Sequence, residues 1–492
     1  MLLPGQGVAY WIARVIYNLA FHPLAKYPGP KIAAATDVWW AYKSTTGRYP
    51  WIIQDLLEQY GDVVRIAPNE LVFLTPQAAK DIYLAQEKNL ELFVQVGYDA
   101  LDTGDGGISG ETNPVEHREI AKRLAPAFSS RNFKAKEPTI HKHIDLFVDK
   151  MKNIGAGPRG AELRQWSDWL ALDLSSDMTY GYEMNQMRDL KDSVLLGSTL
   201  KLNLFLILSQ ITRKFSLLKP LAYLAIPPSV WLMLPKLLRL NTEEVNTRIQ
   251  RRGQMAHLDY FEQLVPADQP VPEDDNYIYH LKNIAGQLLL ASWQPLANQF
   301  YSLIFFLLQE PDAYKALAGE VRGEFSSYSD ISLETIAKLK FLDACVQESL
   351  RLHQDTVDGL PRISPGAVVD GHYIPQGVTC QISYFAAARS PRFFTDPLKY
   401  RPERWLPTDH PRYSARFKDD NLKASKPFSQ GPRGCPGGAI ALATIKLLMA
   451  KVIWQFDLEA SLGQGRLSFE KDFKFLVFWE RPPFWVQFQP CK

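Results

Sequence analysis

The sequence predicts a single, mostly helical domain with a smaller β-rich lobe. Residues 76 to about 355 carry mainly helical patterns, whereas strand-like runs lie before them, at Val63–Thr75, and after them, in AVVDGHYIP and VTCQISY. Hydrophobic residues make up 46% of the 492 residues and charged residues 22%. This is the composition of a globular protein that is long enough to bury a large core.

The first 26 residues form a segment of their own, and residues 27–492 form the domain. Val8–Phe21 is apolar but contains Arg14, and it is shorter than the roughly 20 apolar residues that span a bilayer. No small-residue cleavage site follows it, as a signal peptide would require. The stiff sequence YPGP at residues 27–30 then breaks the chain. We expect an interfacial or shortened membrane anchor; the alternative is an ordinary amphipathic helix packed on the domain.

The first elements of the domain follow from turn and cap signals. In Val63–Thr75, two short strands flank a turn at Pro68-Asn69. Thr75 and Pro76 then supply the N-cap and the first residue of a helix.

A very long helix is predicted from about Asn276 to Leu308. Pro295 lies inside it, where a proline removes one backbone hydrogen bond and kinks the helix. Pro311 begins the next helix, and residues 341–353 (FLDACVQESLRLH) form another.

The region Leu195–Leu240 is unusually apolar and is interrupted by basic residues, among them Arg213, Lys214, Lys219 and Lys236. Two interpretations remain open: core helices, or a surface that dips into a membrane and covers an apolar pocket. Together with Gly97–Asn113, this region is expected to line the pocket that sets substrate specificity.

Charge and cysteine usage exclude several classes of protein. Lys and Arg number 55 and Asp and Glu number 53, so the chain lacks the basic excess of a nucleic-acid-binding protein. The four cysteines are far apart, without a CxxC pair or a Cys/His cluster, which argues against a disulfide scaffold and a zinc site. No Walker loop, GxGxxG or HExxH motif occurs.

One cysteine lies in an unusual setting, the stretch FSQGPRGCPGG from Phe428 to Gly438. Backbone N–H groups of a tight loop at a helix N-terminus stabilise an anion, and thiolate is the form of cysteine that binds metals. Glycines let the loop approach a flat group, and Arg433 can pair with a carboxylate beside it. A haem-bound thiolate suits this pattern; a catalytic nucleophile and an inert buried cysteine remain alternatives at this point.

The spacing of Phe428, Gly431, Arg433, Cys435 and Gly437 resembles the haem-binding signature of the cytochrome P450 family. The resemblance implies a cytochrome P450 fold and a haem whose iron is ligated by the Cys435 thiolate. It also implies that Phe428 packs beneath the haem and that Arg433 pairs with a propionate. Thiolate ligation favours cleavage of the O–O bond.

Other stretches resemble the same family in the expected order. Glu348 and Arg351 match its ExxR helix motif, and Arg404 in RPERW matches the arginine that completes a structural Glu/Arg/Arg triad. Arg362 matches an arginine that reaches the second propionate. The sequences FHPLAKYPGP and GDVVRIAPNELVF resemble members from filamentous fungi that act in secondary metabolism.

The chain departs from the family on the distal helix, where a small pair, an acid and a threonine are usual. Here Ala291 is followed by Ser292, Trp293, Gln294 and Pro295. Gln cannot act as an acid, and proline has neither a hydroxyl nor an N–H. Three accounts compete: substrate or water supplies the protons; the chemistry needs little proton delivery, as in desaturation, phenol coupling, rearrangement or peroxide use; or the protein is catalytically weak. We expect Ala291, Trp293, Gln294 and Pro295 to lie on the distal, substrate side, with Trp293 turned to the core as the alternative.

A second departure concerns the propionates. His117 matches a position where the family often has Trp or His, but the arginine expected four residues later is Ala121. Arg118, Lys122 or Arg123 is a possible replacement, and a capping or core role is the alternative for His117.

The resemblance therefore implies an enzyme that oxidises an apolar small molecule with O₂ and with electrons from an NADPH-dependent cytochrome P450 reductase. It implies haem as cofactor and a position on the cytosolic face of the endoplasmic reticulum membrane. The rival from another class is a haem protein without oxygenase turnover.

Overall fold

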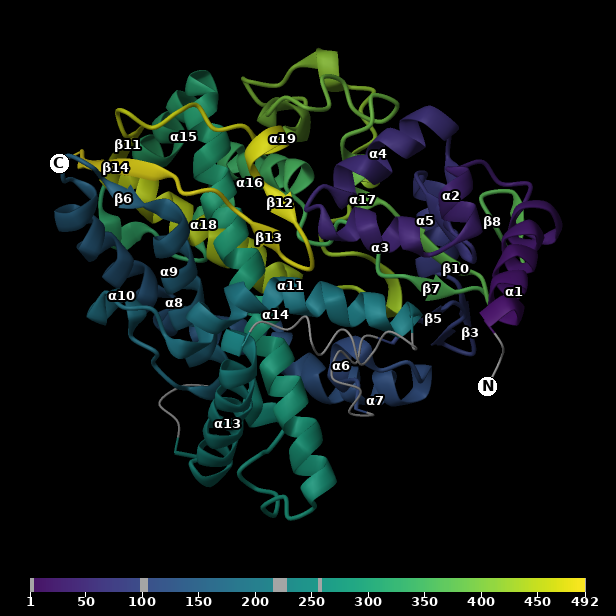
Figure 1. Ribbon diagram of the computed structural model, residues 1–492. Coiled ribbons are helices and arrows are strands. Elements are labelled where there is room, and N and C mark those ends of the chain that lie inside the picture. The colour runs from purple at the N-terminus through teal and green to yellow at the C-terminus, as the bar shows by residue number, and fades with distance from the viewer. Residues whose placement is uncertain (1–3, 98–104, 216–227, 255–258, 492) are drawn as a thin grey trace.

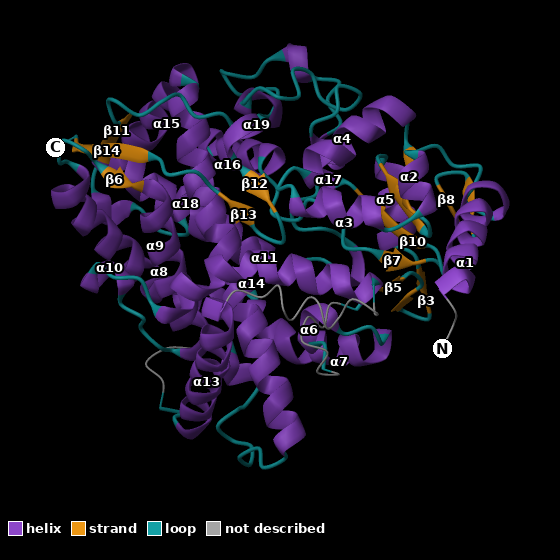
Figure 2. Cartoon of the chain, in the orientation of Figure 1, coloured by secondary structure: helices purple, strands orange, loops and turns teal. Residues whose placement is uncertain are grey.

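The computed structural model describes residues 4–97, 105–215, 228–254 and 259–491 (Figure 1). Helices fill most of the molecule, and the larger sheet lies at one end, beside α1 (Pro4–Ile16) and α5 (Pro76–Tyr83) (Figure 2). The mostly helical architecture with a smaller β-rich lobe is confirmed.

The β-rich lobe is built on a mixed five-stranded sheet. Its order is β1 (Val63–Ala67), β2 (Glu70–Phe73), β10 (Thr379–Ile382), β7 (Arg362–Ile363) and β5 (Val94–Gln95). The strands β1 and β2 flank the predicted Pro68-Asn69 turn, and β10 joins β2 in parallel. The sheet therefore unites the start of the domain with the segment that follows residue 355. AVVDGHYIP supplies the separate hairpin of β8 (Ala367–Val369) and β9 (His372–Ile374).

Helix ends follow the predicted chemistry. The Thr75 hydroxyl accepts a hydrogen bond from the Ala78 N–H at 3.1 Å and caps α5, with Pro76 at the first helical position. The long helix α14 spans Asp275–Gln309, with Pro295 inside it. Pro311 begins α15 (Pro311–Glu324).

The helical body surrounds α14, which lies against α9 (Leu163–Tyr180) along much of its length. Its central and C-terminal part is buried almost continuously from Ala297 to Leu307. Other helices are α4 (Tyr49–Tyr60), α7 (Pro114–Leu124), α8 (Ser130–Lys150), α11 (Val194–Lys214), α13 (Pro228–Gln250), α16 (Lys340–Leu352) and α18 (Gly438–Gln455). A three-stranded sheet of β11 (Phe456–Ala460), β14 (Trp485–Pro490) and β6 (Ala161–Glu162) closes the end opposite the larger sheet (Figure 1).

The N-terminal segment is helical and exposes apolar side chains. Helix α1 continues through a wider turn, Tyr17–Phe21, and Trp11 and Phe21 are 53% and 72% exposed. Asn18 is buried and donates to the Ala35 carbonyl at 2.9 Å, which fixes the end of the segment to the domain.

The region Leu195–Leu240 contains features of both interpretations. In α11, Leu196 and Ile207 are buried, whereas in α13 Trp231 and Leu232 are exposed. Residues 216–227, which include Lys219, lie outside the described residues. The described part of the region thus combines core packing with an exposed apolar surface.

Among the described helices, α18 has the length and apolar composition of a possible membrane span. However, 61% of it is buried inside the protein, and it directly follows the cysteine loop. Packing against the other helices accounts for its composition.

Candidate functional site

The cysteine loop folds back on itself before α18 begins. The Cys435 N–H donates to the Phe428 carbonyl at 2.8 Å, and the Gly434 N–H donates to the Gly431 carbonyl at 2.9 Å. Gly437 is the N-cap of α18. The loop therefore presents the Cys435 side chain at a helix N-terminus, as the sequence predicted.

Steric contact requires a glycine at position 431 of the loop, whereas position 437 has ordinary contact distances. Gly431 has a φ of +79°, and a Cβ there would lie 1.9 Å from the Tyr83 carbonyl oxygen. A Cβ on Gly437 would lie 3.9 Å from the Cys435 sulfur and 3.7 Å from the Phe128 ring. The backbone of the loop at Gly431 thus lies directly against the Tyr83 carbonyl, which sets the path of the loop. The Cys435 side chain lines the cavity.

The environment of the Cys435 thiol has opposing effects on its pKa. Burial raises the pKa, while the backbone N–H groups of Gly437 and Gly438 lower it, and the net direction is upward. The N–H groups at the helix N-terminus thus favour the thiolate, as predicted, but the effect of burial on the pKa is larger. A thiolate here requires a further positive charge, such as a metal ion at the sulfur.

A fully buried carboxylate joins α16 to the chain that precedes the cysteine loop. Arg351 Nε lies 2.8 Å from Glu348 Oε2, and Arg404 Nε lies 3.1 Å from Glu348 Oε1. Trp405 Nε1 and the Arg401 N–H donate to the same carboxylate, both at 2.9 Å. The structure thus brings the predicted triad Glu348, Arg351 and Arg404 together.

Burial by itself would raise the pKa of Glu348, but Arg351 and Arg404 outweigh burial and lower it. A lowered pKa means that the ionised carboxylate stabilises the fold above its unfolded pKa, and that this contribution is lost as the pH falls through the folded pKa. The triad is therefore an acid-sensitive structural element.

Three basic side chains converge at one edge of the site. His117, on α7, is 7% exposed. Burial, together with the nearby charges of Arg433 and Arg362, lowers the pKa of His117 to about 4. The structure thus brings His117, Arg433 and Arg362 into one region, where a neutral imidazole and two arginine side chains could receive an anionic group.

Arg433 already has a carboxylate partner within the protein. Its Nε lies 2.8 Å from Oε2 of Glu91, on β4 (Leu90–Glu91), and its Nη1 donates to the Glu111 carbonyl at 2.6 Å. Arg362 donates to the Leu360 carbonyl at 2.9 Å. The predicted pairing of Arg433 with a propionate must therefore share this arginine with Glu91, a partner that the sequence did not indicate.

Ala121 faces the same cavity as His117, but none of the three candidate replacements for the missing arginine lines it. Arg118, Lys122 and Arg123 are all exposed on the outer face of α7. The expectation that one of them takes the place of that arginine is not supported.

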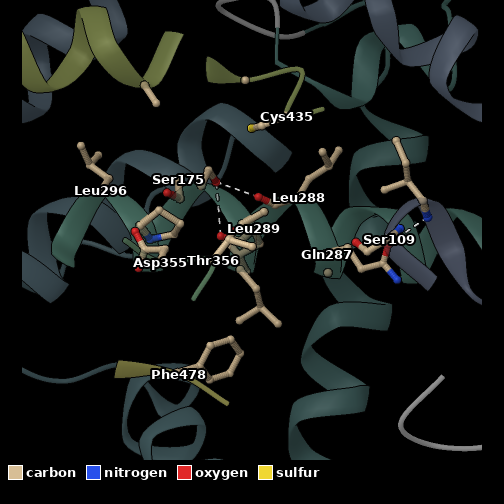
Figure 3. A pocket seen from close by; sticks show the side chains of 18 of the residues that line it. Ser109, Ser175, Gln287, Leu288, Leu289, Leu296, Asp355, Thr356, Cys435 and Phe478 are labelled. Atoms are coloured by element: carbon tan, nitrogen blue, oxygen red, sulfur yellow. Dashed lines mark hydrogen bonds between the residues drawn. The ribbon is translucent and has the colours of Figure 1, made fainter. Parts of the chain in front are cut away.

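A cavity of about 1580 Å³ separates the cysteine loop from α14. It exceeds the volume of about 300–1,000 Å³ that is typical of a small-molecule site. Figure 3 shows Cys435 on one wall and Leu288 and Leu289 on α14, with Phe478 farther from the sulfur. The cavity has room for a flat cofactor beside the thiol and for a second, apolar molecule.

The distal wall differs from the prediction in which side chains it presents. Ala291 and Pro295 line the cavity as expected. Trp293 does not: it is 2% exposed and packs in the hydrophobic core, which corrects the distal assignment. Gln294 is half-buried and is also not among the lining residues. Successive helical residues are about 100° apart, so the positions beside Ala291 and Pro295 cannot all face one side.

Ser292 is a lining residue that the sequence reasoning passed over. Its hydroxyl donates to the Leu288 carbonyl at 2.7 Å and lies 3.2 Å from the Leu289 carbonyl oxygen. Residues 291, 292 and 295 lie on one face of the helix because their spacing is i, i+1, i+4. This spacing could have predicted that Ser292 lines the cavity beside Ala291 and Pro295. Ser292 is the hydroxyl that this turn of α14 presents to the cavity.

The residues present fit a haem group. A cysteine sulfur lies on one wall, its loop contains glycines, and His117 and Arg433 line the cavity, with Arg362 near His117. A thiolate suits iron, and His117, Arg362 and Arg433 suit carboxylate arms of a macrocycle.

Comparison with known proteins agrees with this chemistry. The family model described as "Cytochrome P450" matches residues 38–488. The cytochrome P450 monooxygenase TwmD of Talaromyces wortmannii is 44% identical over 482 residues, which cover 98% of this chain and 94% of that protein. The cytochrome P450 monooxygenases poxC of Penicillium oxalicum and btcC of Colletotrichum orbiculare are 35% and 33% identical. The first match covers 96% of this chain and 91% of its relative, and the second covers 98% and 93%.

Replacement of Gly431 with alanine is expected to displace the cysteine loop, because the new Cβ meets the Tyr83 carbonyl oxygen. The matched control is Gly463→Ala, where φ is +85° but nothing lies within 4 Å of the added Cβ. The control should cost about 1 kcal/mol of backbone strain and keep haem. Gly431→Ala should be less stable than the control and lose bound haem, measured by thermal unfolding and haem content. Equal behaviour of the two variants would contradict the steric account.

Glu348→Gln is expected to destabilise the protein by about 3–5 kcal/mol, because it leaves the buried Arg351 guanidinium without a counter-charge and leaves Arg404 with Asp420 as its carboxylate partner. Glu324→Gln, which removes an exposed ion pair with Lys338, should change stability by less than about 1 kcal/mol. Denaturant unfolding of both variants measures the difference. A similar small effect for both would show that the triad does not hold the structure together.

Proposed function

Since the chain belongs to the cytochrome P450 family, we propose that it is a haem-thiolate monooxygenase that oxidises an apolar intermediate of fungal secondary metabolism. The oxidant is O₂, with electrons derived from NADPH. The observation that carries the proposal is the position of Cys435, on one wall of a large cavity whose opposite wall is apolar α14.

In this proposal each residue of the site has a role. Cys435 ligates the haem iron, and His117, Arg362 and Arg433 bind its carboxylate arms. The bound haem would supply O₂ activation, which thiolate ligation favours. Phe428 packs against Gly438 at the base of the loop, since a Cβ on Gly438 would lie 3.2 Å from the Phe428 ring. This contact helps to hold the sulfur in place.

The chemistry of the lining supports an apolar substrate. Leucines of α14 and Phe478 make up much of the wall across from the sulfur (Figure 3). Phe205 and Leu206 of α11 and Leu237 of α13 also line the cavity, as expected for the region Leu195–Leu240. Burial of such surface favours binding by about 25 cal/mol per Å² of apolar area.

Proton supply on the distal side distinguishes the candidate reaction classes. Pro295 has no N–H to donate to the Ala291 carbonyl, so this carbonyl and the Ser292 hydroxyl oxygen, whose proton is donated to the Leu288 carbonyl, can accept hydrogen bonds from water. Ordinary monooxygenation with water or substrate as proton source is the first candidate. The position of Pro295 on the cavity wall favours a second candidate, chemistry with little proton delivery: desaturation, phenol coupling, rearrangement or peroxide-driven oxidation. A haem protein without oxygenase turnover is the remaining rival.

An exposed basic surface beside the cysteine loop is the proposed docking site for the protein that delivers electrons. Phe128, which follows α7, lies next to Gly437. The exposed basic side chains of this part of the chain are Arg118, Lys122, Arg123, Arg131 and Lys134. Such a patch suits an acidic surface of an NADPH-dependent cytochrome P450 reductase.

Exposed apolar side chains support attachment to a membrane surface. They occur on the N-terminal segment, at Trp11 and Phe21, and on α13, at Trp231 and Leu232. We propose that residues 1–26 bind the cytosolic face of the endoplasmic reticulum membrane and that residues 27–492 form the catalytic domain.

The haem-loaded protein with a fungal reductase is expected to consume NADPH in the presence of O₂. Ser292→Ala should divert more of these electrons to hydrogen peroxide, because it removes the hydroxyl of the distal turn. Gln294→Ala is the matched control. It should divert fewer electrons to hydrogen peroxide than Ser292→Ala does, since Gln294 does not line the cavity. Stoichiometry of NADPH, O₂ and peroxide measures the effect.

An intact haem spectrum without NADPH consumption would favour the non-oxygenase rival. Turnover with added peroxide but not with NADPH would favour the peroxide-using class. Equal diversion in the two variants would contradict the role of Ser292.

A further inference from the structure

We propose that Asp355 forms a polar subsite that binds a hydroxyl or N–H group of an otherwise apolar substrate. The inference rests on the proposed function, because it takes the cavity as the substrate site, and it adds the chemical feature by which the substrate is recognised. No sequence motif indicated this residue.

Asp355 reaches the cavity from the segment that follows α16. Figure 3 shows Asp355 and Thr356 beside Leu296 of α14, on the side of the cavity away from Gln287 and Ser109. The apolar side chains Leu288 and Leu289 lie between these two polar groups. A molecule in the middle of the cavity would therefore meet a carboxylate at one end of an apolar wall.

One oxygen of Asp355 is held by the protein. The amide nitrogen of Asn298 donates to Oδ1, and Asn298 itself is fully buried on α14. Within the described ranges, no residue donates to the second oxygen, Oδ2, whereas carboxylates ordinarily accept several hydrogen bonds. Asn298 thus holds the carboxylate through Oδ1, and Oδ2 remains as an acceptor for a molecule in the cavity.

Gln287, a polar lining residue across the cavity from Asp355, has no such open acceptor. The side-chain oxygen of Gln287 accepts from the Ile108 and Ser109 N–H groups, each at 2.9 Å. Its nitrogen donates to the Gly106 carbonyl at 2.8 Å. Gln287 therefore connects α14 to α6 (Gly107–Gly110), and its side-chain oxygen accepts its hydrogen bonds from within the protein.

Among the residues that the structure describes, none forms a direct ion pair with Asp355. Burial raises its pKa to about 6, while the hydrogen bond from Asn298 and the more distant charge of Arg481 act in the opposite direction. Arg481 itself is bound to Asp168 and, at 2.9 Å, to the Ala297 carbonyl. At neutral pH the group is thus mainly a carboxylate in an apolar setting, where a hydrogen bond to a charged acceptor is strongest.

This arrangement discriminates between substrates. A hydroxyl or N–H group satisfies the open oxygen, whereas an ether leaves it desolvated and unpaired, and a carboxylate is repelled. Asp355 is therefore a specificity-determining residue, and the substrate is expected to carry a donor at one end of an apolar skeleton.

The test uses a pair of probes, 4-phenylphenol and its O-methyl ether, with the haem-loaded protein. Isothermal titration calorimetry should show that the wild type binds the phenol about tenfold more tightly than the ether. In Asp355→Asn and Asp355→Ala the two affinities should become nearly equal. The matched control is Asp358→Asn, because Asp358 is a second carboxylate that lines the cavity; this variant should keep the preference.

A wild type that binds the two probes equally, prefers the ether or binds neither would overturn the proposal, and this result needs no variant to fold. A preference that persists in both Asp355 variants, or that Asp358→Asn abolishes equally, would also overturn it. The haem-thiolate absorption of the same samples reports on the proposed function separately, so failure of the subsite and failure of the function are distinguishable.

Discussion

The buried carboxylate of Glu348 is the interaction on which the site depends. It binds Arg351 within α16, and Arg404 and Trp405 from the segment that leads to the cysteine loop. Arg351 also donates to the Ala388 carbonyl at 2.6 Å, so the same cluster fixes the end of α17 (Tyr384–Ala388). Because these charges are out of water, each requires the others, and the cluster positions the chain that carries Cys435.

Much of this architecture follows from local signals in the sequence. The apolar length of the long helix gave its bounds to within one residue, and turn residues gave the pairing of β1 with β2. The spacing from Phe428 to Gly437 indicated the cysteine loop. Each of these features is set by residues that are neighbours along the chain, or by a backbone geometry that few residue types allow.

The features that escaped prediction depend on tertiary contacts. Helix α14 is apolar on nearly all sides, so its pattern does not say which face meets the cavity. Trp293 was expected on the distal side, with the core as the alternative, and it packs in the core. Arg433 pairs with Glu91, which lies 342 residues earlier in the chain. Asp355 belongs to no motif; its position on the cavity wall becomes visible only once α16 and α14 are packed together.

The central claim is that Cys435 is the thiolate ligand of a haem. The most direct measurement is the absorption spectrum of the reduced, carbon-monoxide-treated protein beside that of Cys435→Ser. The account predicts a strongly red-shifted Soret band in the wild type and its loss in the variant. A Soret band at the ordinary position in both proteins would contradict the account, because another group would then hold the iron.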